Sequence, residues 1–341
     1  MNFPITHYEF LMKHMGGEFL VDIFLKKLNR KNVSFDEFAR LFENELDGWN
    51  DIIDSKLGRS YNLGNISDLN LFGRQMFHSY KMKIHGEKIY YLSRNACETL
   101  YNTRLTIDSE FIESPFEQIY MHTDQDEIFL TDHTGVMPMR GIYLSLARDP
   151  VKNIRFIATS GSNGVKQAKD INYFATFNVP DHGSLEDITD AQMNHFMKPG
   201  SGFILNAGVD MAMLRKIFVF IVNSLLYIGC QNVELVNFIP ESIQKSIDRK
   251  KSGGKIKKLE KLIGRVAQQP FILVNPSKKH NAQETVETGK KLDHQVLVSG
   301  HWRGQWKGSE LDQTRKKEII RIKSYLKGVG PTGENKPHLV K

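Results

Sequence analysis

The sequence predicts an α+β fold: a helical N-terminal region, a central antiparallel sheet packed on a long apolar helix, and a small basic β-rich C-terminal end. Three observations predict it. Apolar residues recur at helical spacing in the first third of the chain, strand-like segments joined by turns follow Ser114-Pro115, and a strongly apolar stretch covers residues 208–227. The chain has 341 residues, 40% of them hydrophobic and 25% charged. This is a globular composition, and the length is ample for a buried core.

The N-terminal region is predicted to be mostly helical. Apolar side chains spaced three and four apart between Phe10 and Leu28 predict one amphipathic helix. Residues 32–46 predict a second helix, with Ser34 as its N-cap and Glu37 as the capping-box partner. A third helix is predicted from about residue 87 to residue 103. The sequence therefore predicts a first region of residues 1–114.

The second region, residues 115–240, is predicted to contain a sheet and a buried helix. Strands are predicted at residues 118–122, 127–131, 136–147, 153–159 and 171–179, separated by turn-forming residues. The pattern predicts an antiparallel meander, because no helix long enough for a crossover intervenes. The stretch 208–227 is apolar nearly all round, which is typical of a core helix. The longest apolar run of the chain, Ile217–Cys230, is broken by Asn223 and Ser224 and is too short to span a bilayer.

The third region, residues 241–341, is strongly basic. It carries 23 Lys and Arg against 10 Asp and Glu, a net charge of +13, whereas the whole chain has a net charge of +7. Such asymmetry is a common sign of contact with RNA, DNA or another polyanion, but a solvated basic face has the same composition. Both interpretations stay open. Local patterns from residue 233 onward predict a basic helical stretch at 240–266, a polar loop at 275–291 and a tail at 327–341. They also predict short strands at 233–238, which still belongs to the second region, and at 271–274, 294–298, 302–306 and 318–325.

Several classes of site are disfavoured. Cys97 and Cys230 lie far apart and form no Cys-x-x-Cys pair, so we expect two reduced thiols and no disulfide scaffold or zinc knuckle. The N-terminus has no basic, apolar leader, which predicts the cytoplasm. No cofactor and no metal are predicted. Three acidic residues and a histidine lie close together in the sequence: Asp124, Asp126, Asp132 and His133. Paired carboxylates can hold Mg²⁺ or serve as acid and base, but Asp is also favoured in turns for its backbone hydrogen bonds.

The most distinctive stretch is Gly300-His301-Trp302-Arg303-Gly304-Gln305-Trp306-Lys307-Gly308. Trp302 and Trp306 lie four residues apart, so in a strand they share one face, and Arg303 points the other way with Gln305 and Lys307. One interpretation has the tryptophans stacking on bases while the cations meet phosphates. The alternative is that both tryptophans anchor a small C-terminal module to the body of the protein.

A direct RNA- or DNA-binding protein, or a nuclease, is one hypothesis from these residues. The nucleic-acid-binding residues would be Arg303, Lys307, Arg315, Lys316, Lys317, Trp302 and Trp306. No catalytic residue is assigned. His301 is the one candidate, as a base toward a ribose hydroxyl, because its ordinary pKa lies near neutrality. A non-catalytic virion or structural protein is a further alternative, since no active-site motif is recognisable.

The block Val298–Gly308, followed by Ile319-Ile320-Arg321-Ile322, resembles a signature of phage- and plasmid-encoded proteins. Among them is the type V-A anti-CRISPR family that suppresses production of the CRISPR effector nuclease. That family also has a helical N-terminal half, two short strands after a proline, and a buried helix before a basic C-terminal end. Here these correspond to Ser114-Pro115 with residues 118–131, and to residues 211–228. The block is short, and the rest of the similarity is in the order of elements.

The resemblance implies a regulator rather than a classical enzyme. Characterised members of the family recognise a segment of the target protein as it emerges from the ribosome, and the target's messenger RNA is then degraded. The implied partners are a target protein or nascent peptide, such as a CRISPR effector, with RNA or ribosome contact and no membrane. A less basic body that holds a peptide and a basic end that faces RNA would suit this role. The residues of a peptide groove do not follow from the sequence.

Overall fold

The computed structural model describes residues 6–14, 17–44, 69–85, 89–114, 117–123, 125–132, 135–148, 151–160, 172–196, 209–230, 235–238, 249, 271–274, 296–298, 301–308, 314–322 and 325–327. The chain forms two compact units, and each is assembled from three separate stretches. Unit 1 comprises Met1–Arg94, Pro115–Asn178 and Val236–Val274, and unit 2 comprises Asn95–Ser114, Val179–Leu235 and Asn275–Lys341. The three consecutive regions predicted above divide the chain by sequence and stay a prediction.

Helices in unit 1 partly follow the predicted pattern. They are α1 (His7–His14), α2 (Gly17–Lys27), a helix over residues 35–44, and α4 (Leu69–His85). The single helix predicted across residues 10–28 is divided into α1 and α2. At Gly17 the chain passes so close to the first helix that a Cβ would lie 2.8 Å from the carbonyl oxygen of Leu11. The predicted N-cap is confirmed, because Ser34 Oγ accepts a hydrogen bond of 3.2 Å from the backbone N–H of Glu37.

The helix predicted from about 87 to 103 is wrong in its first half. Residues Ile89–Leu92 form strand β1, and helix α5 covers only Arg94–Tyr101. The sequence Ile-Tyr-Tyr-Leu favours a strand, because β-branched and aromatic side chains fit a pleated surface. All four residues of β1 are buried, so the segment lacks the alternation that marks a half-exposed strand. A short run that is apolar throughout does not distinguish a buried strand from a helix.

The central sheet of unit 1 has seven strands in the order β7-β6-β5-β2-β1-β9-β8. They are β1, β2 (Gln118–Thr123), β5 (Gly141–Arg148), β6 (Lys152–Thr159), β7 (Asn172–Asn178), β8 (Leu235–Phe238) and β9 (Phe271–Val274). The predicted antiparallel meander is confirmed for β2, β5, β6 and β7. However, β1 pairs with both β2 and β9 in parallel, so the sheet is mixed rather than antiparallel.

The predicted strand 136–147 is two strands. Strand β3 (Phe129–Asp132) pairs with β4 (Gly135–Pro138) in a separate hairpin, and β5 begins at Gly141. Met139 is completely buried, and its backbone N–H donates to the carbonyl oxygen of Ile128 at 2.9 Å. The backbone of Arg140 donates to Thr159 at 2.8 Å. The two residues between β4 and β5 therefore bond toward different strands, and the continuous apolar pattern conceals the break.

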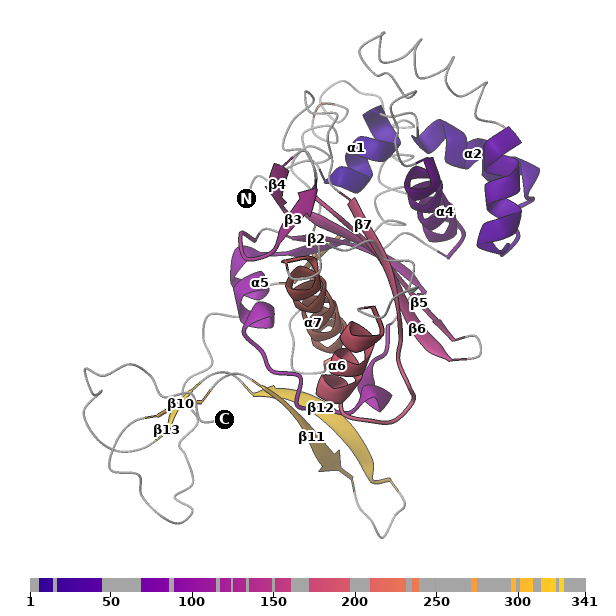
Figure 1. The fold of residues 1–341 in the computed structure, drawn as a ribbon. Helices are drawn as coiled ribbons and strands as arrows, with labels where there is room; N and C mark the ends of the chain where they lie inside the picture. Colours follow the sequence, from indigo (N-terminus) through magenta and orange to yellow (C-terminus); the bar gives the residue numbers. More distant parts are fainter. Residues whose placement is uncertain are drawn as a thin grey trace. The chain divides into compact units, whose positions relative to one another are not determined.

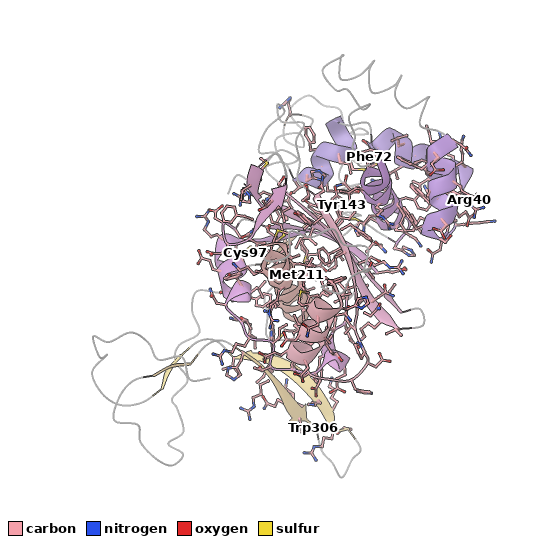
Figure 2. The ribbon with its side chains drawn as sticks, viewed as in Figure 1. Arg40, Phe72, Cys97, Tyr143, Met211 and Trp306 are labelled. Carbon is pink, nitrogen blue, oxygen red and sulfur yellow. The ribbon has the colours of Figure 1, made fainter. Side chains whose placement is uncertain are left out.

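The core of unit 1 lies between its helices and one face of the sheet. Helix α4 contacts β2 and β5, and Figure 1 shows α1, α2 and α4 grouped on one side of the strands. The cross-strand row Ile89, Tyr120, Tyr143 and Ile157 meets buried helical residues that include Phe72 and Tyr80 (Figure 2 labels Phe72 and Tyr143). Burial of this apolar surface is the main stabilising contribution of the unit.

Unit 2 contains the long apolar helix. Its elements are α5, the 3₁₀ turn η2 (Ser109–Phe111), α6 (Leu185–Phe196), α7 (Val209–Gly229), and the hairpin of β11 (His301–Lys307) with β12 (Lys316–Ile322). Strand β10 (Val296–Val298) pairs with β13 (Tyr325–Lys327). Helix α7 confirms the predicted apolar helix. By length and composition its segment Met211–Gly229 is sufficient to cross a membrane, but 78% of it is buried, as in the core helix of a soluble protein.

The basic helical stretch predicted at 240–266, apart from residue 249, lies outside the described residues. So do the predicted polar loop at 275–291 and the tail after residue 327. Most of the basic residues of the last third that the structure describes therefore lie in the β11–β12 hairpin.

Candidate binding site

The β11–β12 hairpin contains the distinctive sequence block. Trp302 lies opposite Arg321, and Trp306 lies opposite Lys317. Directly opposed residues of an antiparallel pair project to the same side, and so do alternate residues along a strand. Trp302, Trp306, Arg321 and Lys317 therefore share one face, as the sequence predicted for the two tryptophans. Arg303 and Lys307 belong to the other face.

At two positions of the block, Gly304 and Gly308, the structure explains why the residue is glycine. Gly308 ends β11 with a φ of +90°, a conformation that L side chains rarely adopt, and a Cβ there would collide with the backbone of Thr314. A Cβ on Gly304 would lie 2.7 Å from the Lys317 side chain. The absence of a side chain at Gly304 thus leaves room for Lys317 to extend along the hairpin.

Trp302 anchors the hairpin to the rest of unit 2. Its side chain is only 2% exposed, and its Nε1–H donates to Asn223 Oδ1 at 2.7 Å. Asn223, which is fully buried in α7, donates in turn to the carbonyl oxygens of Leu100 at 2.9 Å and Thr103 at 2.8 Å. These carbonyls lie at the C-terminal end of α5, where helical partners run out. From its position in α7, Asn223 therefore forms hydrogen bonds both with β11 and with the end of α5.

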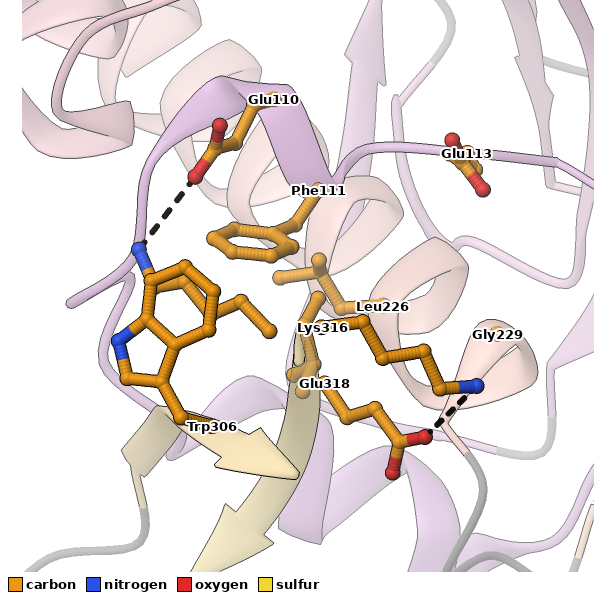
Figure 3. Close-up of a pocket in the computed structure, with 10 residues that line it drawn as sticks. Glu110, Phe111, Glu113, Leu226, Gly229, Trp306, Lys316 and Glu318 are labelled. Carbon is orange, nitrogen blue, oxygen red and sulfur yellow. Dashed lines mark hydrogen bonds and ion pairs between the residues drawn. The ribbon is translucent and has the colours of Figure 1, made fainter. Parts of the chain in front are cut away.

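Trp306 has a different environment. The side chain, which Figure 2 labels, is 56% exposed. The guanidinium of Arg315 lies 4.9 Å from the centroid of its ring. Trp306 borders an open pocket of about 690 Å³ (Figure 3), hereafter the Trp306 pocket. The residues that line the pocket are Glu110, Phe111, Glu113, Leu226, Gly229, Trp306, Lys316, Lys317, Glu318 and Ile319. They come from η2 and the segment after it, from the end of α7, and from both strands of the hairpin.

The cations of the pocket lie against carboxylates. Lys317 Nζ is 3.4 Å from Glu110 Oε1 and 4.9 Å from the centroid of the Phe111 ring. Lys316 Nζ is 3.0 Å from Glu318 Oε1, and Lys307 Nζ is 2.6 Å from Glu318 Oε2. Hydrogen bonds from the two lysines lower the pKa of Glu318 below its ordinary value. Three of the five cations predicted to bind phosphate are thus within ion-pairing distance of Glu110 or Glu318.

The structure brings only some of the predicted residues together. Trp306 and Arg315 contact each other, and Lys316 and Lys317 line the same pocket. Trp302 and His301 lie at the other end of β11, where half-buried His301 forms a parallel bridge with Arg104. Arg303 and Lys307 are exposed. Three residues of the pocket were not predicted from the sequence, because they are distant in sequence from the block and form no motif with it: Glu110, Phe111 and Leu226.

Of the acidic residues considered as metal ligands, Asp126 forms ion pairs with two arginines. Asp126 accepts hydrogen bonds of 2.7 Å from Arg94 and 2.9 Å from Arg140, and the bond from Arg140 lowers its pKa. Asp124 and His133 lie outside the described residues. Within the described part of the chain, no three His, Cys, Asp or Glu side chains are placed to hold a metal ion. Cys97 and Cys230 are buried and form no disulfide with each other, as expected of reduced thiols.

The chain is an α+β protein with an open pocket beside its C-terminal hairpin. Its sequence matches no protein-family model. No curated protein matches the sequence either. Among solved structures, the chain is similar to the crystal structure of AcrVA2, with a TM-score of 0.42 and 12% sequence identity. The similarity covers 89% of this chain and 96% of that one. The two proteins are distant structural neighbours, and function does not transfer between chains on a likeness of this size.

Proposed function

We propose that this chain is an anti-CRISPR-like regulator from a mobile element, which binds a target protein or nascent peptide and lowers the target's expression. The proposed contact surface is the Trp306 pocket. The observation that carries the proposal is the exposure of Trp306, at 56%, beside an open pocket whose lining combines apolar and charged side chains. The block that resembles the signature of mobile-element proteins forms β11, the strand that carries this tryptophan.

The chemistry of the pocket favours a protein segment. Tryptophan is among the most frequent anchor residues in protein interfaces, because a large ring buries much area at little entropic cost. Phe111, Leu226 and Ile319 supply apolar surface for a partner's side chain. Lysines and glutamates around them offer both donors and acceptors, which suits the backbone and mixed charges of a peptide.

The ion pairs weigh against a phosphate backbone as the main ligand of this pocket. A polyanion would have to separate Lys317 from Glu110, and Lys307 and Lys316 from Glu318, and would leave those carboxylates beside its own charges. A peptide can instead replace these ion pairs one at a time with its own charged side chains. The buried Trp302–Asn223 contact holds the far end of β11, so the pocket wall is fixed before binding.

The test is expression of the chain in a bacterial host that carries a type V-A CRISPR effector, with effector protein and messenger RNA both measured. We expect wild-type chain to lower both, and to co-purify with the effector or its ribosome-bound messenger after RNase treatment. Trp306→Ala should lose at least tenfold of the association, since interface tryptophans often contribute more than about 2 kcal/mol. Phe129→Ala, which removes a 44% exposed aromatic residue in unit 1, is the matched control and should behave as wild type.

A result in which Trp306→Ala binds and represses as well as wild type would reject the Trp306 pocket as the contact surface. An unchanged level of effector protein and messenger with wild-type chain would reject the regulator itself. Recovery of RNA in general, with protein partners lost after RNase, would favour direct nucleic-acid binding.

Direct RNA or DNA binding is the second candidate, and one observation favours it. Arg303, Lys307, Arg315, Lys316 and Lys317 are all exposed on a single hairpin. Binding through them would weaken steeply with salt, because phosphate contacts release counterions. Arg303→Gln should then reduce affinity and the salt slope together, and binding that does not depend on salt would reject this candidate. If cleavage is found, His301→Ala tests whether that histidine contributes to it.

A further inference from the structure

Two of the three described carboxylates that line the Trp306 pocket are paired with lysines. Glu110 lies 3.4 Å from Lys317, and Glu318 is within ion-pairing distance of two lysines. The third carboxylate, Glu113, is exposed and forms no ion pair with a cation among the described residues. Figure 3 shows Glu113 apart from the two bonded pairs, with no interaction drawn to another lining residue. A negative charge without a described counter-charge therefore borders the pocket.

The C-terminal end of α7 adds partial negative charge to the same pocket. Leu226 and Gly229, which line it, lie in the last turn of the helix. The last four carbonyl groups of a helix have no N–H partner within the helix, and its aligned peptide dipoles make this end attract cations. The last turn of α7 contains no basic residue, and a Cβ on Gly229 would have no described atom within 4 Å. At Gly229 the end of the helix therefore has no covering side chain.

The described lysines of the lining are engaged elsewhere. Lys316 Nζ and Lys317 Nζ lie 3.0 Å and 3.4 Å from carboxylates other than Glu113. Arg321 is also near α7, but its guanidinium lies 5.9 Å from the ring centroid of Tyr227, which does not line the pocket. A cation that meets Glu113 would thus come from a partner.

Apolar surface lies within the same pocket. Trp306 is 56% exposed, and Phe111 and Ile319 are half-buried, so part of each side chain is accessible. Lys and Arg side chains pack their methylene stems along apolar surface while the charged end reaches a polar group. A pocket of about 690 Å³ that combines these walls with Glu113 therefore suits a cationic side chain and an apolar neighbour.

We propose that the segment recognised at the Trp306 pocket is basic and apolar. Its Lys or Arg side chain pairs with Glu113 beside the end of α7, and a neighbouring apolar side chain packs on Trp306 and Phe111. This inference rests on the proposed function, because it takes the Trp306 pocket as the contact surface. The protein as a whole has a net charge of +7, which attracts acidic ligands at long range. A preference for a basic segment would therefore arise locally, at Glu113.

The experiment measures binding of fluorescein-labelled nine-residue peptides to the full-length protein by fluorescence anisotropy. The probe repeats Ser-Leu-Lys three times, and two matched peptides replace every Lys by Glu or every Leu by Ser. We expect the Ser-Leu-Lys peptide to bind about fivefold more tightly than either matched peptide, because each of them lacks one half of the interaction. The preference over the Glu peptide should shrink as the salt concentration rises, since salt screens exposed charges.

Two substitutions and a control test whether Glu113 causes the preference. Glu113→Gln should weaken binding of the Ser-Leu-Lys peptide by about two- to fivefold, the range of an exposed charge pair, without weakening binding of the Glu peptide. Glu113→Lys should reverse the preference between these two peptides. Glu186→Gln makes the same change at an exposed glutamate in the first turn of α6, outside the pocket lining, and should bind as wild type.

No detectable binding of the Ser-Leu-Lys peptide, or equal binding of the Glu peptide, would overturn the proposal. Equal binding of the peptide without Leu would reject the apolar half of the recognition, and an equal loss in Glu186→Gln would reject Glu113 as its cause.

Failure here and failure of the proposed function are distinguishable. If Trp306→Ala abolishes repression in the host while Glu113→Gln leaves the peptide preference unchanged, the proposed function stands and this inference fails. If the peptide preference depends on Glu113 but the wild-type chain represses nothing, the regulator is rejected and the recognition of basic, apolar segments stands.

Discussion

The two ends of strand β11 carry the same residue type on the same face, yet their tryptophans have opposite environments. Trp302 is 2% exposed and Trp306 is 56% exposed, four residues further on. The difference lies in what each meets on α7. Trp302 meets Asn223 in the interior of the helix, whereas Trp306 lies at a pocket lined by Leu226 and Gly229, the last residue of the helix. The shared strand face thus determines the direction in which both tryptophan side chains project. The point at which α7 ends determines which of the two is buried.

The largest expected effect is at the buried end. Trp302→Ala should destabilise the protein by about 3–5 kcal/mol, because it removes a large buried side chain and leaves a cavity. The measurement is urea denaturation followed by circular dichroism. Trp302→Phe, which keeps most of the ring area but lacks the Nε1–H, should lose less. A cost below about 1 kcal/mol for Trp302→Ala would contradict its role as an anchor.

The second effect concerns the partner of Trp302. Asn223→Leu should cost about 1–3 kcal/mol, because it leaves the Nε1–H of Trp302 and two carbonyl oxygens at the end of α5 without their buried partner. A double-mutant cycle with Trp302→Phe separates the tryptophan contact from the carbonyl contacts. If the two costs simply add, Asn223 supports α5 alone, and the comparison between the two ends of β11 needs another cause.

A smaller effect, dependent on pH, is expected at the exposed end. The pKa of Glu318 is lowered in the folded protein by its hydrogen bonds to Lys307 and Lys316. The unfolded protein therefore binds the proton first, so the stabilising contribution is present above the ordinary pKa of 4.5 and is lost as pH falls through the lowered value. The difference in stability between wild type and Glu318→Gln should thus be present at pH 7 and vanish at strongly acidic pH.

The control for that prediction removes the donors. With Lys307→Gln and Lys316→Gln together, the pH-dependent difference between Glu and Gln at position 318 should disappear. Persistence of the difference in this background would assign the lowered pKa to other groups.

The smallest effect on stability is expected for Trp306→Ala. Because more than half of the side chain is exposed, the free energy of unfolding should change by no more than about 0.5 kcal/mol, as for most surface substitutions. Thermal denaturation of the wild type and this variant in parallel measures it. A loss comparable with that of Trp302→Ala would mean that Trp306 is a second structural anchor, which would remove it from the proposed binding surface.

Local patterns predicted much of the fold. The apolar stretch became α7, the Ser34 cap was confirmed, and the turn-separated strands became the meander β2-β5-β6-β7. Strand β1 was missed because a short run buried on every side has no period of its own. Its parallel pairing with β9 joins residues about 180 positions apart, which no local pattern records.

The alternation of side chains along the Gly300–Gly308 block could be predicted from the sequence alone, because alternation along a strand is a property of the backbone. The sequence did not determine which tryptophan is buried. That depends on Asn223 and on the end of α7 at Gly229, in a distant part of the chain. The ion pair of Lys317 with Glu110 and the cation–π contacts of Arg74 with two phenylalanine rings have the same origin. Only tertiary structure brings these groups together, because contacts between remote segments form at three-dimensional distances and not at sequence spacings.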